Sequence, residues 1–194
     1  MTRITSSLKV MSIATALLFA GAPASGSTLL AHDLESLSTL SDHICTARVV
    51  DATSFMKGGR IYTLSRVEII ESVKGADRQG NLLEVVTAGG HSEWFSQKVF
   101  GAAELEVGAE YLLFLEHRGS VDISHPVGMT QGALPVSIQA DTADRQVSPP
   151  KSIPNLMRKS LEDGSLHPAA LWINQPERLS DVLTRIRGFI GGEK

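Results

Sequence analysis

The chain has 194 residues, of which 18 are Lys or Arg, 21 are Asp or Glu and one is cysteine. This length suits one domain, or one domain with an appendage, and the apolar and charged contents of 42% and 20% are typical of a globular protein. The single cysteine excludes an intrachain disulfide and a multi-cysteine zinc site. The net charge of −3 argues against nucleic acid as a partner, because phosphate binding requires a basic face.

Residues 1–26 have the order of charges and apolar residues that is typical of a secretory signal peptide. Arg3 and Lys9 precede an apolar stretch over 10–22, and small residues over 22–27 supply the cleavage pattern. The alternative is an uncleaved membrane anchor, but a stretch of about 13 residues is shorter than the ~20 that span a bilayer. We therefore expect cleavage near residue 26 and no stable membrane insertion afterwards.

Export changes the charge of the working chain. Removal of residues 1–26, which carry two basic residues and no acidic one, leaves 168 residues with 16 basic and 21 acidic side chains, a net charge of −5. Secreted eukaryotic domains of this size usually carry cysteine pairs. The sequence therefore predicts a bacterial protein of the periplasm or the extracellular medium.

The middle of the chain predicts a short helix followed by a series of strands. Leucines at three-to-four spacing predict an amphipathic helix over 28–42 (Leu30, Leu34, Leu37 and Leu40). From His43 the pattern alternates, with Cys45, Ala47 and Val49 on one face, as suits the crowded interior of a small barrel. Further strands are expected over 61–73, 81–87, 111–115, 121–124 and 131–138, with a hairpin turn at 57–60 and a strand buried on both faces at 111–115. Such short strands separated by glycine-rich turns favour an antiparallel barrel or sandwich.

The last quarter of the chain changes in composition. Residues 139–154 are rich in Asp, Ser and Pro and predict an extended linker, and residues 155–194 predict a helical extension. Its final helix has one apolar stripe, formed by Leu179, Val182, Leu183, Ile186 and Ile190. This stripe either docks on the barrel to cover an open edge or end, or binds a partner.

Motifs of known catalytic chemistry are absent from the sequence: there is no nucleophile elbow, phosphate loop, zinc-protease motif or dinucleotide fingerprint. Cys45 lies in an apolar strand pattern and is expected in the core. The closest approach to a local metal-ligand pair is His91 with Glu93, with His117 and His125 as distant partners across a hairpin, and solvated loop histidines are the alternative. We expect no catalytic residue, no resident metal and no cofactor.

The loop from Gly89 to Gly108 carries Trp94, Phe95, Phe100 and Leu105 outside a clear strand pattern. These side chains either fold back and plug the mouth of the barrel or form an exposed aromatic contact for a partner. On the second interpretation, the candidate contact residues are His91, Glu93, Trp94 and Phe95.

An ordered series of motifs resembles a family of bacterial exported domains of unknown function. The series runs through Leu40-x-Asp42-x-Ile44-x-x-Ala47-Arg48-Val49-Val50, Arg60-Ile61-Tyr62-Thr63, Val73-Lys74-Gly75, Gly89-Gly90, Val107-Gly108-x-Glu110-x-Leu112-Leu113-Phe114-Leu115 and Gly128-x-x-Gln131-Gly132. Those domains look like the OB-type barrel of netrin modules and of tissue inhibitors of metalloproteinases. The resemblance covers residues 37–138 and implies a mainly β fold, a five-to-six-stranded antiparallel OB-like barrel within a domain spanning 28–138.

The chain departs from these inhibitors at their functional end. The inhibitors chelate the protease zinc through an N-terminal cysteine held by disulfides, whereas Cys45 lies inside a predicted strand. No zinc-chelating residue is therefore carried over, and the resemblance implies a fold only. We expect a non-enzymatic exported binding module whose partner is an envelope or secreted protein. The alternatives are an inhibitor or companion of a secreted protease and, third, a metal-binding protein or enzyme that uses the loop His and Glu residues.

Overall fold

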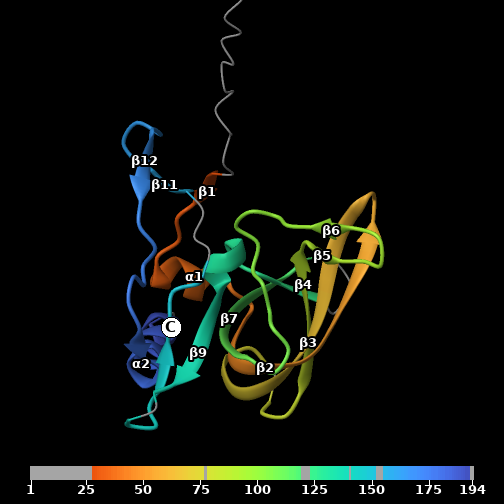
Figure 1. The fold of residues 1–194 in the computed structure, drawn as a ribbon. Helices are drawn as coiled ribbons and strands as arrows, with labels where there is room; N and C mark the ends of the chain where they lie inside the picture. The colour runs from red at the N-terminus through yellow and green to blue at the C-terminus, as the bar shows by residue number, and fades with distance from the viewer. Residues whose placement is uncertain (1–27, 77, 119–122, 140, 152–154, 193–194) are drawn as a thin grey trace, which may run out of the picture.

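A computed structural model describes residues 28–76, 78–118, 123–139, 141–151 and 155–192. The predicted signal peptide over 1–26 lies outside the described residues. The fold is mainly β, with a short helix α1 (Leu34–Leu40) near the beginning of the described chain and a helix α2 (Leu179–Gly191) at its end (Figure 1). These features confirm the predicted fold class in outline. In the part of the chain that the structure describes, no helix combines the length and hydropathy that a bilayer crossing requires.

The longest elements are two 15-residue strands, β2 (His43–Lys57) and β3 (Arg60–Lys74), which form a hairpin. Lys57 pairs with Arg60, and the two intervening residues, Gly58 and Gly59, have φ values of +59° and +74°. A turn with both central residues in the left-handed region matches the right-handed twist of the flanking strands, and glycine adopts it without steric cost. The predicted hairpin turn at 57–60 is confirmed.

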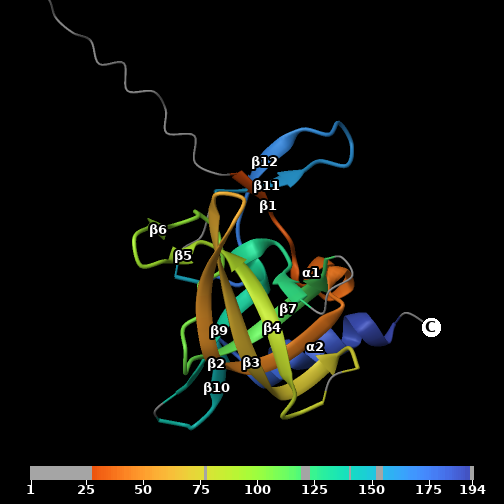
Figure 2. The same cartoon turned by 90° about the vertical axis from the view of Figure 1, so that its right-hand side faces the viewer.

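The β2–β3 hairpin is strongly curved (Figure 2). The pairing shifts register between Ile44 and Cys45, between Thr46 and Ala47, and between Val49 and Asp51. Such irregularities bend a strand and increase its local twist. The bend lets the first half of β2 pair with β7 (Glu110–His117) on its other edge.

The main sheet has eight strands in the order β13-β10-β9-β7-β2-β3-β4-β8, and β7 pairs with β8 in addition. Pairings therefore run from β7 through β2, β3, β4 and β8 and return to β7. The β4–β8 pair is parallel and the other four of this circuit are antiparallel. The remaining bounds in this sheet are β4 (Leu82–Ala88), β8 (Ile123–Pro126), β9 (Ala133–Ile138), β10 (Arg145–Val147) and β13 (Glu177–Arg178).

Two apolar cores lie on opposite faces of β7. Leu113 and Leu115 face one core, which also holds Cys45, Ala47 and Val49, as the alternation of β2 predicts. Leu112 and Phe114 face the second core, and all four of these β7 side chains are fully buried. The prediction that this strand is buried on both faces is confirmed.

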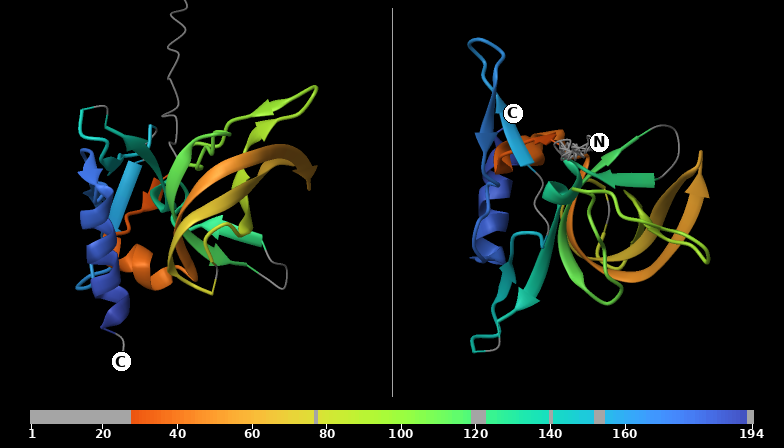
Figure 3. Two further views of the ribbon diagram at one scale, coloured as in Figure 1. Left: turned by 90° about the horizontal axis from the view of Figure 1, so that it is seen from below. Right: turned by 45° about the horizontal axis from the view of Figure 1, so that its top comes forward.

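The second core is closed by the two helices. It takes in Leu34 and Leu37 from α1 together with the buried apolar stripe of α2, formed by Leu179, Val182, Leu183 and Ile186. Figure 3 shows both helices on one side of the main sheet and the β2–β3 hairpin on the other. Of the two interpretations of the α2 stripe, the structure therefore supports docking on the sheet.

The helix predicted over 28–42 is too long. Thr28–Leu30 forms a strand, β1, which pairs in parallel with β11 (Asn155–Lys159). The helix begins only after Asp33, whose carboxylate accepts a hydrogen bond from the Ser36 N–H at 2.8 Å and thereby caps the first turn. This hydrogen bonding also lowers the pKa of Asp33. Leu30 lies in β1 and Leu40 is the last residue of α1; both are exposed, so neither extends the buried stripe.

The C-terminal part holds more strand than predicted. β10 lies inside the expected linker 139–154 and pairs with both β9 and β13, with Val147 fully buried. The region expected to be helical, 155–194, also contains β11, β12 (Leu166–Ala169) and β13, of which β11 joins β1 and β12 in a three-stranded sheet. The structure has thirteen strands in its described residues rather than five or six, and two of the pairings are parallel. Strands of two to five residues are too short to show a readable alternation, and distant pairing partners decide them.

Candidate functional site

A small two-stranded sheet carries the aromatic residues of the long loop. Its strands are β5 (Gly90–His91) and β6 (Ser96–Gln97), and the turn between them holds Trp94 and Phe95. Trp94 is 83% exposed and Phe95 is 65% exposed. The turn is closed by the Ser92 N–H, which donates to the Phe95 carbonyl at 2.7 Å, and by the Phe95 N–H, which donates to Ser92 Oγ at 3.1 Å. Both aromatic side chains are thus presented to solvent by a hydrogen-bonded turn.

The exposed fractions of the aromatic side chains decide whether they plug the interior or face solvent. Phe100 is also exposed, and only Leu105 of the four large apolar residues packs against a core, the one that contains Cys45. The expectation that the whole group plugs the interior is wrong for Trp94, Phe95 and Phe100. The β5–β6 turn directs the first two away from the sheet, and Phe100 is exposed in the turn that follows β6.

The β5–β6 hairpin is anchored on the β2–β3 hairpin through polar side chains. The His91 N–H donates to Ser54 Oγ at 3.1 Å, and Thr63 Oγ1 donates to the Gly89 carbonyl at 2.9 Å. The Ile61 N–H donates to Gln97 Oε1 at 2.8 Å. Gly90 has a φ of +135°, and a Cβ there would collide with the hydroxyls that make these bonds. The anchoring therefore fixes the position of the aromatic turn relative to the main sheet.

A second pair of exposed apolar side chains lies at the end of β2. Phe55 and Met56 are 37% and 56% exposed, and the Phe55 ring stacks on Tyr62 with centroids 5.8 Å apart. We use the name tip surface for the exposed apolar residues of these two hairpins (Phe55, Met56, Trp94 and Phe95). The two hairpins that carry it overlap in Figure 1, whereas Figure 2 shows their ends apart, with the β5–β6 end to one side of the β2–β3 end.

A groove of about 610 Å³ lies beneath the β5–β6 hairpin, between it and the loop that follows. Its lining combines apolar residues with polar ones, and the polar ones include Ser54, Thr63, His91, Gln97 and Glu104. Of the four residues expected to form the contact, His91 lines this groove, while Glu93, Trp94 and Phe95 are exposed on the same hairpin. The structure thus brings the four together on one projecting element.

The histidines proposed as distant metal partners do not meet His91. His125 on β8 places Nδ1 3.1 Å from the Val86 carbonyl, and His117 on β7 lies against His43. Among the described residues there is no group of three or more His, Cys, Asp and Glu side chains that could hold a metal ion. Cys45 is buried, as expected.

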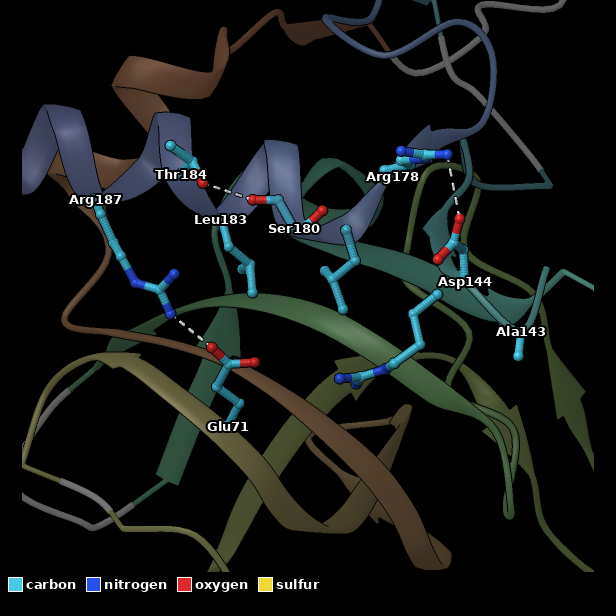
Figure 4. Close-up of a pocket in the computed structure, with 10 residues that line it drawn as sticks. Glu71, Ala143, Asp144, Arg178, Ser180, Leu183, Thr184 and Arg187 are labelled. Carbon is cyan, nitrogen blue, oxygen red and sulfur yellow. Dashed lines mark hydrogen bonds and ion pairs between the residues drawn. The ribbon is translucent and has the colours of Figure 1, made fainter.

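A further cavity of about 390 Å³ lies between α2 and the edge of the main sheet (Figure 4). Arg178 pairs with Asp144 at 3.4 Å, and Arg187 pairs with Glu71 at 2.6 Å. The third arginine of the cavity, Arg145, pairs with Glu110. No sequence pattern reveals these partners of Arg178 and Arg187. Because each arginine faces a carboxylate, the cavity has little excess charge for an anionic ligand.

His125 gives the protein a pH-dependent component of stability. Burial lowers its pKa below the ordinary value of 6.5, so the unfolded chain binds a proton more readily than the folded chain. The free energy of unfolding should therefore fall as the pH drops below about 6.5. We expect His125→Gln to remove this component, measured by urea denaturation between pH 5 and pH 7.5. His91→Gln, at an exposed ring, is the control, and an equal change of slope in both variants would contradict the assignment.

Comparisons with known proteins add no evidence on the function of this site. No protein-family model matches the sequence, and no curated protein matches it significantly.

Proposed function

We propose that the five-strand circuit is an OB-like barrel, similar in architecture to netrin modules and to tissue inhibitors of metalloproteinases. The pairings support this proposal, because they pass through β2, β3, β4, β8 and β7 and return to β2. The OB fold is likewise a five-stranded barrel with a Greek-key path. The β9, β10 and β13 strands extend this barrel at β7, and the helices α1 and α2 cover that side.

We also propose that the chain is exported. The support is the order of the sequence over 1–26, in which two basic residues, an apolar stretch and small residues follow one another. A periplasmic or extracellular location follows from this proposal.

For the exported chain we propose a non-enzymatic function: it binds an envelope or secreted protein through the tip surface. The observation that carries this proposal is the exposure of Trp94 and Phe95 on an anchored turn. The binding free energy of a protein interface is concentrated in a few residues, among which tryptophan is enriched, and aromatic residues are more frequent in interfaces than on the rest of the surface. The hydrogen bonds to Ser54, Thr63 and Gln97 position the turn in advance, which lowers the entropy cost of binding.

The charges around the tip surface specify the chemistry of the partner. Lys57 and Arg60 are exposed at the end of the β2–β3 hairpin, next to Phe55 and Met56. Glu93 is an exposed acidic residue of the β5–β6 turn, so the basic character belongs to the end of the β2–β3 hairpin, in a chain whose net charge without residues 1–26 is −5. We therefore propose a partner surface on which apolar side chains are flanked by carboxylates, since such charges would steer its approach.

The test is capture of exported proteins by the purified chain and by the variant Trp94→Ala/Phe95→Ala. Both side chains are exposed, so the variant should melt like the wild type, with a change in the free energy of unfolding within about 0.5 kcal/mol. Its affinity for the captured partner should fall about 30-fold or more, as expected for a binding contribution of about 2 kcal/mol.

The matched control is Leu161→Ala. Leu161 is a fully exposed apolar residue in the turn between β11 and β12, outside the tip surface. It should retain full binding. Equal capture by all three proteins would overturn the proposal, as would binding to vesicles of anionic lipid in place of any protein. If the captured partner is a protease, its activity in the complex tells whether the chain inhibits it.

A further inference from the structure

Two histidine rings meet at the end of the main sheet where β2 begins, opposite the tip surface. His43 is the first residue of β2 and His117 is the last residue of β7. Their Nε2 atoms are 2.6 Å apart, the ring centroids are 4.5 Å apart and the ring planes cross at 83°. This contact is a ring-to-ring hydrogen bond, in which one Nε2 carries the proton and the other accepts it, so the same two nitrogen atoms lie close enough to share one ion once that proton is lost.

Neighbouring groups fix the backbone of His117 and the outer side of both rings. The His117 main-chain N–H donates to Asp42 Oδ2 at 2.8 Å, and Ser124 Oγ lies 3.4 Å from Nδ1 of the His117 ring. On the other ring, a Cβ at Gly75 would lie only 2.6 Å from His43 Nδ1, so the backbone there packs closely against the imidazole. Contacts of this kind orient the histidine ligands of metal sites.

The separation of the nitrogen atoms favours one coordination geometry. With bonds of about 2.0 Å, two imidazoles that are neighbours in a square plane have nitrogen atoms about 2.8 Å apart, whereas a tetrahedral ion holds them about 3.3 Å apart. The observed 2.6 Å is the length of a direct hydrogen bond, so either geometry requires the rings to separate, and a square-planar ion requires the smaller movement. His117 is exposed, so its ring can move by the small distance required.

We propose that His43 and His117 bind one Cu²⁺ ion through their Nε2 atoms. Imidazole nitrogen suits Cu²⁺, which forms square-planar complexes and binds such ligands more tightly than Zn²⁺. The Asp42 carboxylate, hydrogen-bonded to the His117 main chain, contributes negative charge near the ion. Since the described residues offer no group of three metal-ligating side chains, water molecules complete the coordination. This site is independent of the tip surface.

The test is titration of the purified chain with Cu²⁺ alone, followed by electron paramagnetic resonance and by competition with a chelator of known affinity. We expect one ion per chain with hyperfine splitting from two nitrogen ligands, and weaker binding of Zn²⁺. His117→Gln changes an exposed residue and should preserve the fold, as checked by circular dichroism, while lowering the Cu²⁺ affinity about tenfold or more. His43→Gln should do the same.

The control is His167→Gln, which changes another exposed histidine and should leave Cu²⁺ affinity unchanged. If His43→Gln/His117→Gln binds Cu²⁺ as tightly as the wild type, the proposal is wrong. An equal loss of affinity in His167→Gln would likewise overturn it, because it would show binding distributed over surface histidines.

Discussion

Gly132→Ala is expected to destabilise the protein by about 3 kcal/mol or more, or to prevent folding. Gly132 ends the 3-10 helix Met129–Gly132 that leads into β9, and the backbone of neighbouring strands leaves no room for a side chain. A Cβ there would lie 2.7 Å from Val127 N and 2.9 Å from the Phe114 carbonyl oxygen. Because both neighbours are main-chain atoms, the clash cannot be relieved by a change of rotamer. Thermal and urea denaturation would measure the effect.

The matched control for this substitution is Gly188→Ala in α2. A Cβ at Gly188 would meet nothing within 4 Å, and alanine favours a helix by about 1 kcal/mol over glycine. This variant should therefore be as stable as the wild type or more stable. A folded Gly132→Ala protein with wild-type stability would contradict the close packing of Val127, Gly132 and Phe114.

Ile186→Ala is expected to cost about 2 to 5 kcal/mol of the free energy of unfolding. Ile186 is fully buried between α2 and the rest of the second core, together with Val182 and Leu183. Removal of three carbon atoms at this position leaves a cavity that its neighbours can fill only in part. Urea denaturation followed by circular dichroism would give the change.

Phe189→Ala, three residues further along α2, is the control. Phe189 is 38% exposed, so its truncation should cost much less than that of Ile186, although its side chain is larger. Equal effects of the two substitutions would mean that α2 does not dock on the sheet as described. They would then favour the alternative in which the helix serves a partner.

The parts of the fold that could be predicted from the sequence are those set by local patterns. The alternation of Cys45, Ala47 and Val49 identified a buried face, because successive strand residues point to opposite sides of a sheet. The Gly58-Gly59 pair identified a hairpin, because few other residues adopt its turn.

Other elements depend on partners far away in the sequence and were missed. β1 exists because Thr28–Leu30 pairs with β11, more than 100 residues later. Gln131 reinforces this arrangement: its buried amide accepts from the His32 N–H and donates to the Leu30 carbonyl. β10 is likewise a strand because β9 and β13 flank it, although its composition is that of a linker. No local periodicity encodes these contacts.

The candidate site likewise combines residues that a local pattern reveals with contacts that depend on residues far away in the sequence. Trp94 and Phe95 could be singled out because large aromatic residues stand in a loop rich in glycine, but their exposure depends on the turn at Ser92 and on the anchoring at Ser54. The His43–His117 contact joins residues 74 positions apart, and neither lies in a motif of metal-ligand spacing. Only the pairing of β2 with β7 brings these two rings together.

The fluorescence of Trp94 in the presence of the captured partner tests the role of the tip surface most directly. The chain has two tryptophans, so Trp172→Phe leaves Trp94 as the single indole. The proposal predicts the emission of a water-exposed indole that acrylamide quenches readily, and a blue shift with protection from acrylamide in the complex. Emission and quenching that stay the same in the complex would contradict the proposal that Trp94 forms the contact.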